Sequence, residues 1–346
     1  MSKRINKTTI GLIGFGRFGT LLAAILGCDF KVVVLRRRGS VEELARAKQV
    51  GAEVVDLAIV ATCDIVVLAV PISETETMIK QIAPLMKDGA LLVDTCSVKV
   101  LPCRWLKKFV PKNIEIMGTH PMFGPVTSQF NLEVMSWHLA GLQTVLCPLR
   151  ISDVKYKSIK KYLTDLQLEV IETTPEDHDR QNAKTLGLVH YLGRSLLAAG
   201  VSEQRIYTPG YLDLLKILPH TTSDNWQLFF DMNNFNPYAD EMRERFIAGG
   251  LEIEEKVITS RSEDILEQKR ALIDLYDQRI TALLGRRFAV AKEIGILKKE
   301  RGLPSTVTSR EVEIITTLAK NSRLDKKFLT ALYQVIFAES KRQQTQ

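Results

Sequence analysis

A glycine-rich turn near the N-terminus constrains the fold of this chain more than any other feature. Gly14, Gly16 and Gly19 form the pattern G-x-G-x-x-G between an apolar strand at 10–13 and an apolar helix at 21–26. In a dinucleotide-binding α/β unit, the first glycine permits a tight turn, the second lets the backbone approach a pyrophosphate, and the third allows close helix–strand packing. A glycine-rich turn without a ligand is the competing interpretation. The residues predicted to bind a cofactor here are Gly14, Phe15, Gly16, Arg17, Phe18 and Gly19.

Short apolar runs alternate with helical patterns through the first 150 residues. Apolar runs of this length are typical of parallel strands that are covered by helices on both faces. We therefore predict an α/β Rossmann-type doubly wound domain. The predicted parallel strands are 9–13, 31–35, 64–70, 90–93 and 114–117, with one more strand at 143–149.

Helical periodicity replaces the strand pattern after about residue 150. Thr174 is the expected N-cap of a long helix at 175–199. The other predicted helices are 211–218, 224–232, 237–259, 263–299, 308–321 and 325–346. The predicted domains are an NAD(P)-binding Rossmann domain at 1–150, an all-α substrate and dimerisation domain at 151–260, and an all-α domain of three helices at 261–346.

The composition excludes several classes of protein. No run of about 18 apolar residues is present, so no membrane span is expected. The basic start of the chain leads straight into a strand instead of an apolar signal core, so secretion is not expected. The five cysteines show neither C-x-x-C nor metal-binding spacing, which favours reduced thiols in a cytoplasmic protein without a metal.

Most of the net charge of +7 lies at 261–346, where 17 Lys and Arg face 11 Asp and Glu. Much of this charge lies in or beside an apolar helical pattern, and no basic stripe is interleaved with aromatic residues. A site for a small polyanion is therefore favoured over a nucleic-acid surface. A solvated helical surface is the third interpretation, and it accounts for Lys326 and Lys327 but not for Arg287.

Three arginines, Arg36, Arg37 and Arg38, follow the second strand. An NAD site places an acid at this point to bind the ribose hydroxyls, whereas arginine can bind a 2′-phosphate. We therefore favour NADP over NAD, with Arg36 and Arg37 as candidates for cofactor binding. A solvated basic turn is the alternative.

Two segments follow predicted strands at their carboxyl ends, where open α/β sheets bind ligands. One runs from Asp94 to Lys99, and the other, at 118–125, contains His120. Held in a turn after its strand, His120 is placed to take a proton from a hydroxyl group as hydride leaves the same carbon. A structural histidine on a loop is the alternative.

Six motifs along the first three quarters of the chain share one family pattern. They are G-x-G-x-x-G at 14–19, D-x-x-S-V-K at 94–99, T-H-P-M-F-G-P at 119–125, E-D-H-D at 176–179, H-Y-L-G-R at 190–194 and T-P-G-Y at 208–211. Together they resemble the prephenate/arogenate dehydrogenase family, its plant-type branch more than its enteric one. The resemblance implies that His120 is the base on the ring hydroxyl of the substrate and that Ser97 hydrogen-bonds nearby. It also implies hydride transfer to a nicotinamide and loss of carbon dioxide, which leave an aromatic ring.

Two polar residues on one predicted helix are candidates for binding the substrate. His190 and Arg194 lie four residues apart and therefore share a helix face. A salt-bridge pair on the helix surface is the alternative for Arg194. His178 and Asp179 are expected to hold the domain interface or the start of the helix.

Two positions depart from the family pattern. Many members carry an acid six residues after the catalytic histidine, where this chain has Val126, and enteric relatives carry an arginine where it has Leu212. The first change removes a negative charge that would meet the ammonium group of arogenate. It therefore favours prephenate, although another acid could take over that role.

A cation interrupts an apolar seam in the predicted helix 263–299. The seam consists of Ile273, Tyr276, Ile280, Leu283, Arg287, Val290, Ile294 and Leu297, which predicts a long packed helix. An isolated buried charge costs several kcal/mol, so a protein carboxylate or an anionic ligand must meet Arg287. Lys298 lies about 16 Å along the same face, and the two cations could clamp a small ligand.

A third cation of this helix predicts a dimer. Arg270 lies about 25 Å from Arg287 and about 100° around the helix, so one chain cannot easily bring both into one site. Arg270 of a partner chain could join Arg287 if two long helices pair antiparallel. On the last helix, the polar residues Ser340 and Gln344 continue an apolar stripe, so we expect this face of the helix to meet a polar group.

Seven polar positions with these spacings match a second family pattern. They are Arg270, Arg287, Lys298, Arg310, Glu311, Ser340 and Gln344. The set resembles the all-helical chorismate mutase family over about 263–346, where one family acid is replaced by Val307. The resemblance implies a pericyclic rearrangement without proton transfer, in which the arginines bind two carboxylates. Lys298 and Gln344 would donate to the ether oxygen, and Glu311 would hold the substrate hydroxyl.

The two resemblances imply a bifunctional enzyme of tyrosine biosynthesis. It would convert chorismate to prephenate, and prephenate to 4-hydroxyphenylpyruvate with NADP or NAD. The expected partners are these small molecules and a second copy of the chain, but neither nucleic acid nor a membrane. One alternative is oxidation of arogenate to tyrosine. A second alternative treats the C-terminal helices as an oligomerisation module without chemistry. A third, a different Rossmann oxidoreductase activity, is disfavoured by the motif at 119–125.

Overall fold

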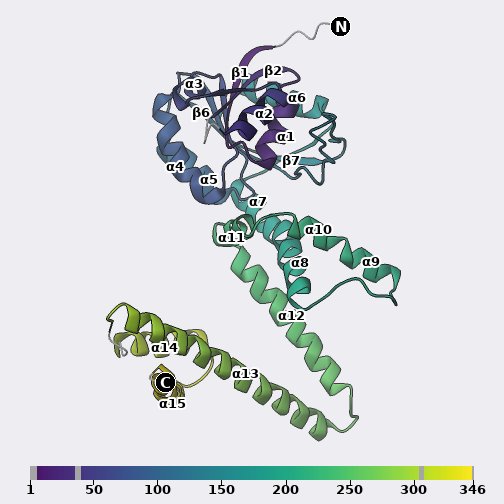
Figure 1. Ribbon diagram of the computed structural model, residues 1–346. Coiled ribbons are helices and arrows are strands. Elements are labelled where there is room, and N and C mark those ends of the chain that lie inside the picture. The colour runs from purple at the N-terminus through teal and green to yellow at the C-terminus, as the bar shows by residue number, and fades with distance from the viewer. Residues whose placement is uncertain (1–5, 36–39, 304–307, 345–346) are drawn as a thin grey trace. The chain divides into compact units, whose positions relative to one another are not determined.

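The computed structural model describes residues 6–35, 40–303 and 308–344. The chain divides into two compact units, Met1–Ile247 and Ala248–Gln346. The first unit contains the β-sheet and the second consists of helices (Figure 1). Each unit is described by itself below.

One eight-stranded sheet forms the centre of the first unit, with strand order β3-β2-β1-β4-β5-β6-β7-β8. Neighbouring strands from β3 to β6 pair in parallel, and β1, β2, β4, β5 and β6 are the five predicted parallel strands. β7 pairs antiparallel with β6, and β8 pairs parallel with β7. The short edge strands β3 and β8 are additions to the predicted set. The strands are β1 Asn6–Ile13, β2 Phe30–Leu35, β3 Glu53–Val55, β4 Ile65–Leu68, β5 Leu91–Asp94, β6 Glu115–Pro121, β7 Gln143–Arg150 and β8 Glu169–Glu172.

Two apolar clusters fill the two faces of this sheet. Alternation along β2 shows the division, since Val33 belongs to one cluster while Val32 and Val34 belong to the other. The Val33 cluster includes side chains of α3, α4 and α5, and the other includes side chains of α1 and α2. This is the doubly wound arrangement that buried parallel strands require. The helices are α1 Arg17–Leu26, α2 Val41–Gln49, α3 Leu57–Ala61, α4 Ile72–Ile82, the short η1 Ala83–Leu85, α5 Val100–Phe109 and α6 Asp153–Asp165.

Helices follow the sheet along the chain. The predicted helix at 175–199 is present as α7 Pro175–Asn182, the π-helical η2 Ala183–Gly187 and α8 Leu188–Ala198. Thr174 is its N-cap and accepts a hydrogen bond from the Asp177 N–H. The single helix predicted at 211–218 is wrong, because two short helices occupy this region. The remaining helices are α9 Pro209–Leu215, α10 Ile217–Thr222, α11 Trp226–Asn234 and α12 Ala239–Thr259, and the boundary between the units falls within α12.

The second unit contains the three predicted helices, α13 Ile265–Glu300, α14 Thr308–Asn321 and α15 Lys326–Gln344. α15 packs against both α13 and α14. The expected packing of the apolar seam is not found within one chain, since Ile280 is 55 % exposed and Leu283 is 63 % exposed. Of the seam residues, Arg287 is half-buried and contacts α15, and Ala291 is the buried residue of α13.

Two further expectations concern membranes and thiols. None of the described helices is both long enough and apolar enough to cross a membrane. All five cysteines are free thiols, and four of them are buried.

Candidate active site

The glycine-rich turn has the geometry of a nucleotide cradle. Gly14 has a φ angle of +105°, and a Cβ there would lie 2.3 Å from the backbone oxygen of Ala69. A Cβ on Gly19 would lie 2.0 Å from the Gly14 oxygen, so α1 packs against the turn too closely for a side chain. A Cβ on Gly16 would meet nothing within 4 Å. Gly16 is the N-cap of α1, and no side-chain hydrogen bond caps the helix. The turn therefore leaves room and N–H donors for a pyrophosphate.

The residues between these glycines differ in what they contact. Phe15 is buried, and the Arg46 guanidinium lies 5.6 Å from its ring centre. Phe18 packs against the apolar cluster beneath α1. Arg17 donates a 2.8 Å hydrogen bond to the backbone oxygen of Ser223, which precedes α11. The turn is thus linked to the helical part of the same unit.

The arginines expected to choose the cofactor lie between β2 and α2. Arg36 and Arg37 are outside the described residues, as is Arg38. The described chain resumes at Ser40, whose side chain accepts from the Glu43 N–H and caps α2.

His120 lies on β6, not in a turn after it, which corrects the sequence-based expectation. β6 continues to Pro121 because the antiparallel β7 pairs with it, and His120 lies opposite Val145. The neighbouring β5 ends earlier, at Asp94. The ring of His120 is therefore held by a paired strand at the carboxyl end of the sheet, where it is 5 % exposed.

A second histidine contacts His120. Nδ1 of His120 lies 2.9 Å from Nε2 of His178, and Nδ1 of His178 lies 2.8 Å from Oδ1 of Asp179. All three side chains are buried. Sequence reasoning assigned His178 and Asp179 to the interface or the helix start and missed this contact. The E-D-H-D motif was the available signal, but it did not indicate which side chain His178 would meet.

Asp179 and Lys99 connect this chain of side chains to the start of α5. The Asp179 carboxylate accepts from the N–H groups of Lys99 at 2.6 Å and Val100 at 2.8 Å. The Lys99 ammonium is fully buried, forms an ion pair with Asp94 and donates to the Thr119 oxygen at 2.6 Å. Lys99 thus ties β5 to β6 directly beside His120.

The electrostatics around His120 favour a neutral imidazole. Burial above all, together with the nearby Lys99 ammonium, holds the pKa of His120 well below its ordinary value of 6.5. For Lys99, burial opposes the charged form, but the Asp94 carboxylate outweighs it and raises the pKa of the ammonium. A neutral ring beside a fixed cation is in the state that a general base requires.

Ser97 and Asn182 carry buried polar atoms with no hydrogen-bond partner in the described part of the chain. These atoms are Oγ of Ser97 and Oδ1 of Asn182. The two residues are joined by a 2.7 Å hydrogen bond from the Asn182 amide to the Ser97 oxygen. Buried polar groups in native proteins usually have partners, so a ligand that bonds to these atoms would complete the site.

His190 and Arg194 share a face of α8, as predicted, but they have different neighbours. Nε2 of His190 lies 3.8 Å from a carboxylate oxygen of Asp224. Arg194 donates to the backbone oxygen of Asp224 at 3.0 Å, and its guanidinium lies 4.0 Å from the centre of the Trp226 ring. Arg194 is therefore held against the start of α11 by backbone and aromatic contacts.

Arg287 in the second unit contacts a hydroxyl group, and the expected anion is not a protein carboxylate of the described residues. Its guanidinium donates a 2.5 Å hydrogen bond to Oγ of Ser340 and lies 5.6 Å from the centre of the Phe337 ring. Among the described residues, no carboxylate lies within ion-pair distance of Arg287. A half-buried guanidinium with one neutral partner keeps donors for a carboxylate.

Gln344 lies where α15 crosses α13. A Cβ on Gly295 would lie 2.9 Å from Cβ of Gln344, so Gly295 permits this close approach. Oε1 of Gln344 is buried and has no hydrogen-bond partner among the described residues. Lys298 follows Gly295 by three residues on the same helix face. Arg287, Ser340 and Gln344 therefore line one contact between α13 and α15.

Comparison with known proteins assigns both units. A family model described as the nucleotide-binding domain of prephenate dehydrogenase matches residues 27–172, and one described as chorismate mutase type II matches 269–345. The chain joins a prephenate dehydrogenase domain to a chorismate mutase domain. Between them, a model described as a TYRAAT1-like C-terminal domain matches 195–269.

Curated relatives match the dehydrogenase region. Arogenate dehydrogenase 2, chloroplastic, of Arabidopsis thaliana is 31 % identical over 246 residues, which are 68 % of this chain and 66 % of the relative. A probable arogenate/prephenate dehydrogenase of Methanocaldococcus jannaschii is 32 % identical over 203 residues, which are 56 % of this chain and 44 % of the relative. The chain thus spans just under two thirds of the first relative and less than half of the second.

A solved structure shares the fold of the dehydrogenase region. Prephenate dehydrogenase of Aquifex aeolicus, in complex with hydroxyphenyl propionate and NAD+, aligns with a TM-score of 0.60 and 20 % identity. The alignment covers 81 % of this chain and all of that chain. At this identity the likeness concerns the fold.

The other mutase candidates lie on more exposed parts of the second unit. Glu311 on α14 pairs with Lys341 on α15 at 2.9 Å. Arg310 and Arg270 are both more than 60 % exposed and pair within their own helices. Arg270 is thus not brought to Arg287 within one chain, as the helix geometry predicted. Val307 lies outside the described residues.

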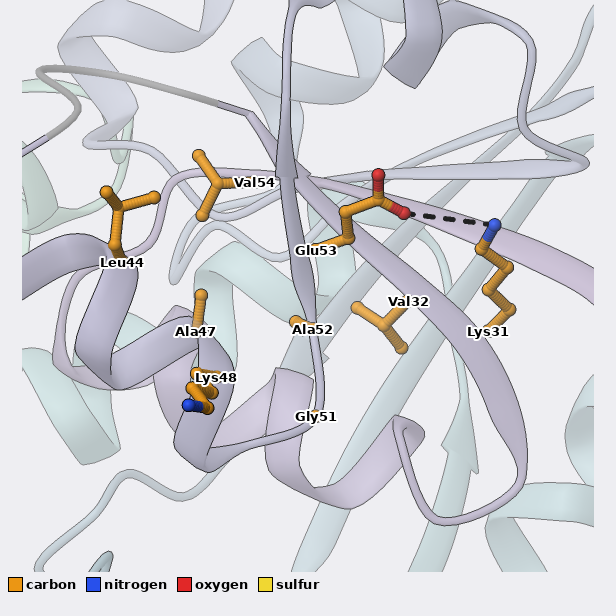
Figure 2. Close-up of a pocket in the computed structure, with 9 residues that line it drawn as sticks. All are labelled: Lys31, Val32, Leu44, Ala47, Lys48, Gly51, Ala52, Glu53 and Val54. Carbon is orange, nitrogen blue, oxygen red and sulfur yellow. Dashed lines mark ion pairs between the residues drawn. The ribbon is translucent and has the colours of Figure 1, made fainter.

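The dehydrogenase domain also contains a hollow of about 370 Å³. Figure 2 shows it between α2 and the starts of β2 and β3, with Lys31 and Glu53 3.9 Å apart on one side. These are the amino ends of parallel strands, whereas His120 lies near the carboxyl end of β6. The hollow contains none of the predicted site residues.

Proposed function

We propose that the chain is a bifunctional enzyme of tyrosine biosynthesis. The second unit would rearrange chorismate to prephenate, and the first would convert prephenate to 4-hydroxyphenylpyruvate by NAD(P)-dependent oxidative decarboxylation. The observation that carries the dehydrogenase proposal is the buried neutral ring of His120 in a domain of the prephenate dehydrogenase family. We also propose domains at 1–150, 151–260 and 261–346.

His120 is the proposed base of the oxidation. Its ring accepts the proton of the ring hydroxyl as hydride leaves the same carbon, while Ser97 donates a hydrogen bond nearby. When bound, a nicotinamide cofactor supplies the hydride acceptor. Loss of carbon dioxide then returns an electron pair to the ring, and His120 gives its proton back to the phenolic oxygen. The step consumes no net proton, and aromatisation makes it effectively irreversible.

NADP is the proposed cofactor, with NAD as the alternative. The glycine-rich turn fits the pyrophosphate of either one. The arginines at 36–38 favour the 2′-phosphate of NADP because a guanidinium can bind it through two hydrogen bonds. Steady-state rates with prephenate and arogenate, each with NADP and with NAD, test cofactor and substrate together. A kcat/KM for NAD equal to that for NADP would contradict the cofactor assignment.

Arogenate is the second candidate substrate, and one observation favours it. The Asp224 carboxylate lies 3.8 Å from His190, a proposed substrate contact, so an acid is available although Val126 replaces the family acid. A carboxylate there could bind the ammonium group of arogenate. In that case, Asp224→Asn would reduce kcat/KM for arogenate and spare that for prephenate. Equal effects on both substrates would leave prephenate as the proposed substrate.

The proposed mutase site lies between α13 and α15. The two carboxylates of chorismate would be bound by Arg287 and Arg310 of one chain and by Arg270 of a second copy. Ser340 would orient Arg287. Lys298 and Gln344 would stabilise the breaking ether bond, while Glu311 would hold the substrate hydroxyl. Catalysis would come from holding the reactive conformer and from electrostatic stabilisation, without a covalent step.

A homodimer is the proposed assembly. The exposed apolar side chains of α13, including Ile280 and Leu283, support pairing with a second copy. The five free cysteines suit a reducing compartment such as the cytoplasm. Incubating the full chain with chorismate in the absence of nucleotide tests the mutase directly. If prephenate does not form, the C-terminal helices would serve oligomerisation alone.

A further inference from the structure

We propose that His178 and Asp179 are positioning residues that fix the tautomer of His120. They leave Nε2 of His120 as the atom that carries the lone pair. The inference rests on the proposed role of His120 as the base. The new point is that His178 and Asp179 select which ring nitrogen of His120 is basic. Neither the family match nor the sequence specifies this.

The tautomer follows from the direction of two hydrogen bonds. An ionised carboxylate can only accept, so the proton between Asp179 and His178 belongs to Nδ1 of His178, 2.8 Å away. In a neutral His178, Nε2 is then an acceptor. Nδ1 of His120, 2.9 Å from it, must therefore donate. A neutral His120 that holds its proton on Nδ1 has its lone pair on Nε2.

The start of α5 holds the Asp179 carboxylate in place. The carboxylate receives the N–H groups of Lys99 and Val100 on separate oxygens, at 2.6 and 2.8 Å. Hydrogen bonds from backbone N–H groups and the positive end of a helix both stabilise a carboxylate. The Asp179 backbone is held as well, because its oxygen accepts from the Asn236 amide at 3.0 Å. Asp179 is fully buried, so water does not compete for these bonds.

The same arrangement stabilises the proton that His120 receives. When Nε2 takes the substrate proton, the positive ring still donates from Nδ1 to His178, whose own N–H points to the Asp179 carboxylate. The new charge is thus compensated through two hydrogen bonds. The proton later leaves from Nε2 to the phenolic oxygen. His178 and Asp179 need not change their own proton count in the cycle.

The wild-type protein provides the first test. Nitrogen NMR of the full chain labelled with 15N-histidine would resolve the tautomer of each of its five histidines. Single His→Asn variants at 120 and 178 assign the two signals. We expect both His120 and His178 to carry their protons on Nδ1 at neutral pH. A proton found on Nε2 of His120 would overturn the inference without any measurement of activity.

Kinetics provide the second test. His178→Asn and Asp179→Asn should lower kcat for prephenate oxidation by up to about 10⁴-fold, the loss seen when an acid that orients a catalytic histidine is replaced by its amide. KM for prephenate should change less than threefold, because neither residue is proposed to touch the substrate. His138→Asn, at an exposed histidine outside the site, is the matched control and should keep full activity.

The two proposals fail in different ways. If His120→Asn retains full dehydrogenase activity, the proposed base is wrong. If His120→Asn is inactive while a folded His178→Asn protein keeps wild-type kcat, the base stands and the positioning role is wrong. Circular dichroism and NADPH binding show whether each variant is folded. Where one variant fails to fold, the wild-type tautomer still decides the question.

Discussion

The Arg287 guanidinium of α13 donates a 2.5 Å hydrogen bond to the Ser340 hydroxyl of α15. The hydroxyl in turn donates to the Ile336 oxygen at 2.7 Å, so its lone pairs remain directed to the guanidinium. This pair orients the cation and leaves its charge uncompensated by any carboxylate of the described chain. An anion that meets Arg287 would therefore have to come from outside the described residues of this chain.

Removing this cation should abolish the mutase reaction. We expect Arg287→Ala to lower kcat/KM for chorismate by about 10²- to 10³-fold, the loss typical of removing one donor to a developing charge. The neighbouring Arg286→Ala is the matched control, because Arg286 is exposed and lies outside the proposed site. Chorismate consumption is measured by absorbance. Similar losses in both variants would show that the effect is not specific to Arg287.

Shared sites predict complementation between inactive subunits. Arg270→Ala and Arg287→Ala proteins should each lose mutase activity, and mixed dimers should regain part of it, because one site of each dimer has both arginines. In the single chain, Arg270 is 63 % exposed and pairs with Glu267. Activity is measured after subunit exchange, which mass spectrometry monitors. No recovery in confirmed heterodimers would argue that Arg270 acts within one chain or not at all.

Substitution of His120 should affect the dehydrogenase activity but not the mutase activity. His120→Asn should lower dehydrogenase turnover by about 10²- to 10⁴-fold, because the loss of a general base removes a contribution of this size. The mutase rate should stay within twofold of the wild-type rate, because the mutase step has no proton transfer. Both rates are measured on the same protein preparation. A parallel loss of both would indicate misfolding.

The pH dependence of the oxidation follows from the state of His120. Burial above all, together with the nearby Lys99 ammonium, holds its pKa well below 6.5. The neutral ring is the base, so kcat/KM for prephenate should not fall until the pH drops below this lowered pKa. The free energy of unfolding depends on pH in the same direction. His120 binds a proton at a higher pH in the unfolded chain than in the folded chain, so this free energy falls as the pH drops below 6.5. A loss of kcat/KM on acidification that has its midpoint above pH 6.5 and is assigned to His120 would contradict the proposed base.

The glycines of the nucleotide turn should respond differently to alanine. Gly19→Ala places a Cβ 2.0 Å from the Gly14 oxygen and should destabilise the first unit by about 1–3 kcal/mol. Gly16→Ala meets no protein atom within 4 Å and should fold normally while weakening the binding of NADPH. Thermal unfolding and NADPH fluorescence measure the two effects. Normal NADPH binding by Gly16→Ala would place the pyrophosphate elsewhere.

Local sequence patterns predicted most of the fold. The parallel strands β1, β2, β4, β5 and β6 and the helices α13 and α14 were predicted because their periodicities and end signals lie within each segment. The short strands β3 and β8 were not predicted, since edge strands of three and four residues carry too little apolar pattern. The continuation of β6 through His120 was also missed, because it depends on pairing with β7.

The sequence by itself indicated which residues are candidates for the chemistry, since the glycine spacing, the histidine of T-H-P-M-F-G-P and the cation in the helical seam are all local patterns. Only the tertiary structure decided what those residues meet. His178 reaches His120 across 58 positions of sequence, and Ser340 reaches Arg287 across 53. Helical and strand periods fix which side chains share a face of one element. They do not fix which elements pack together, and that packing selects the partner of each buried polar group.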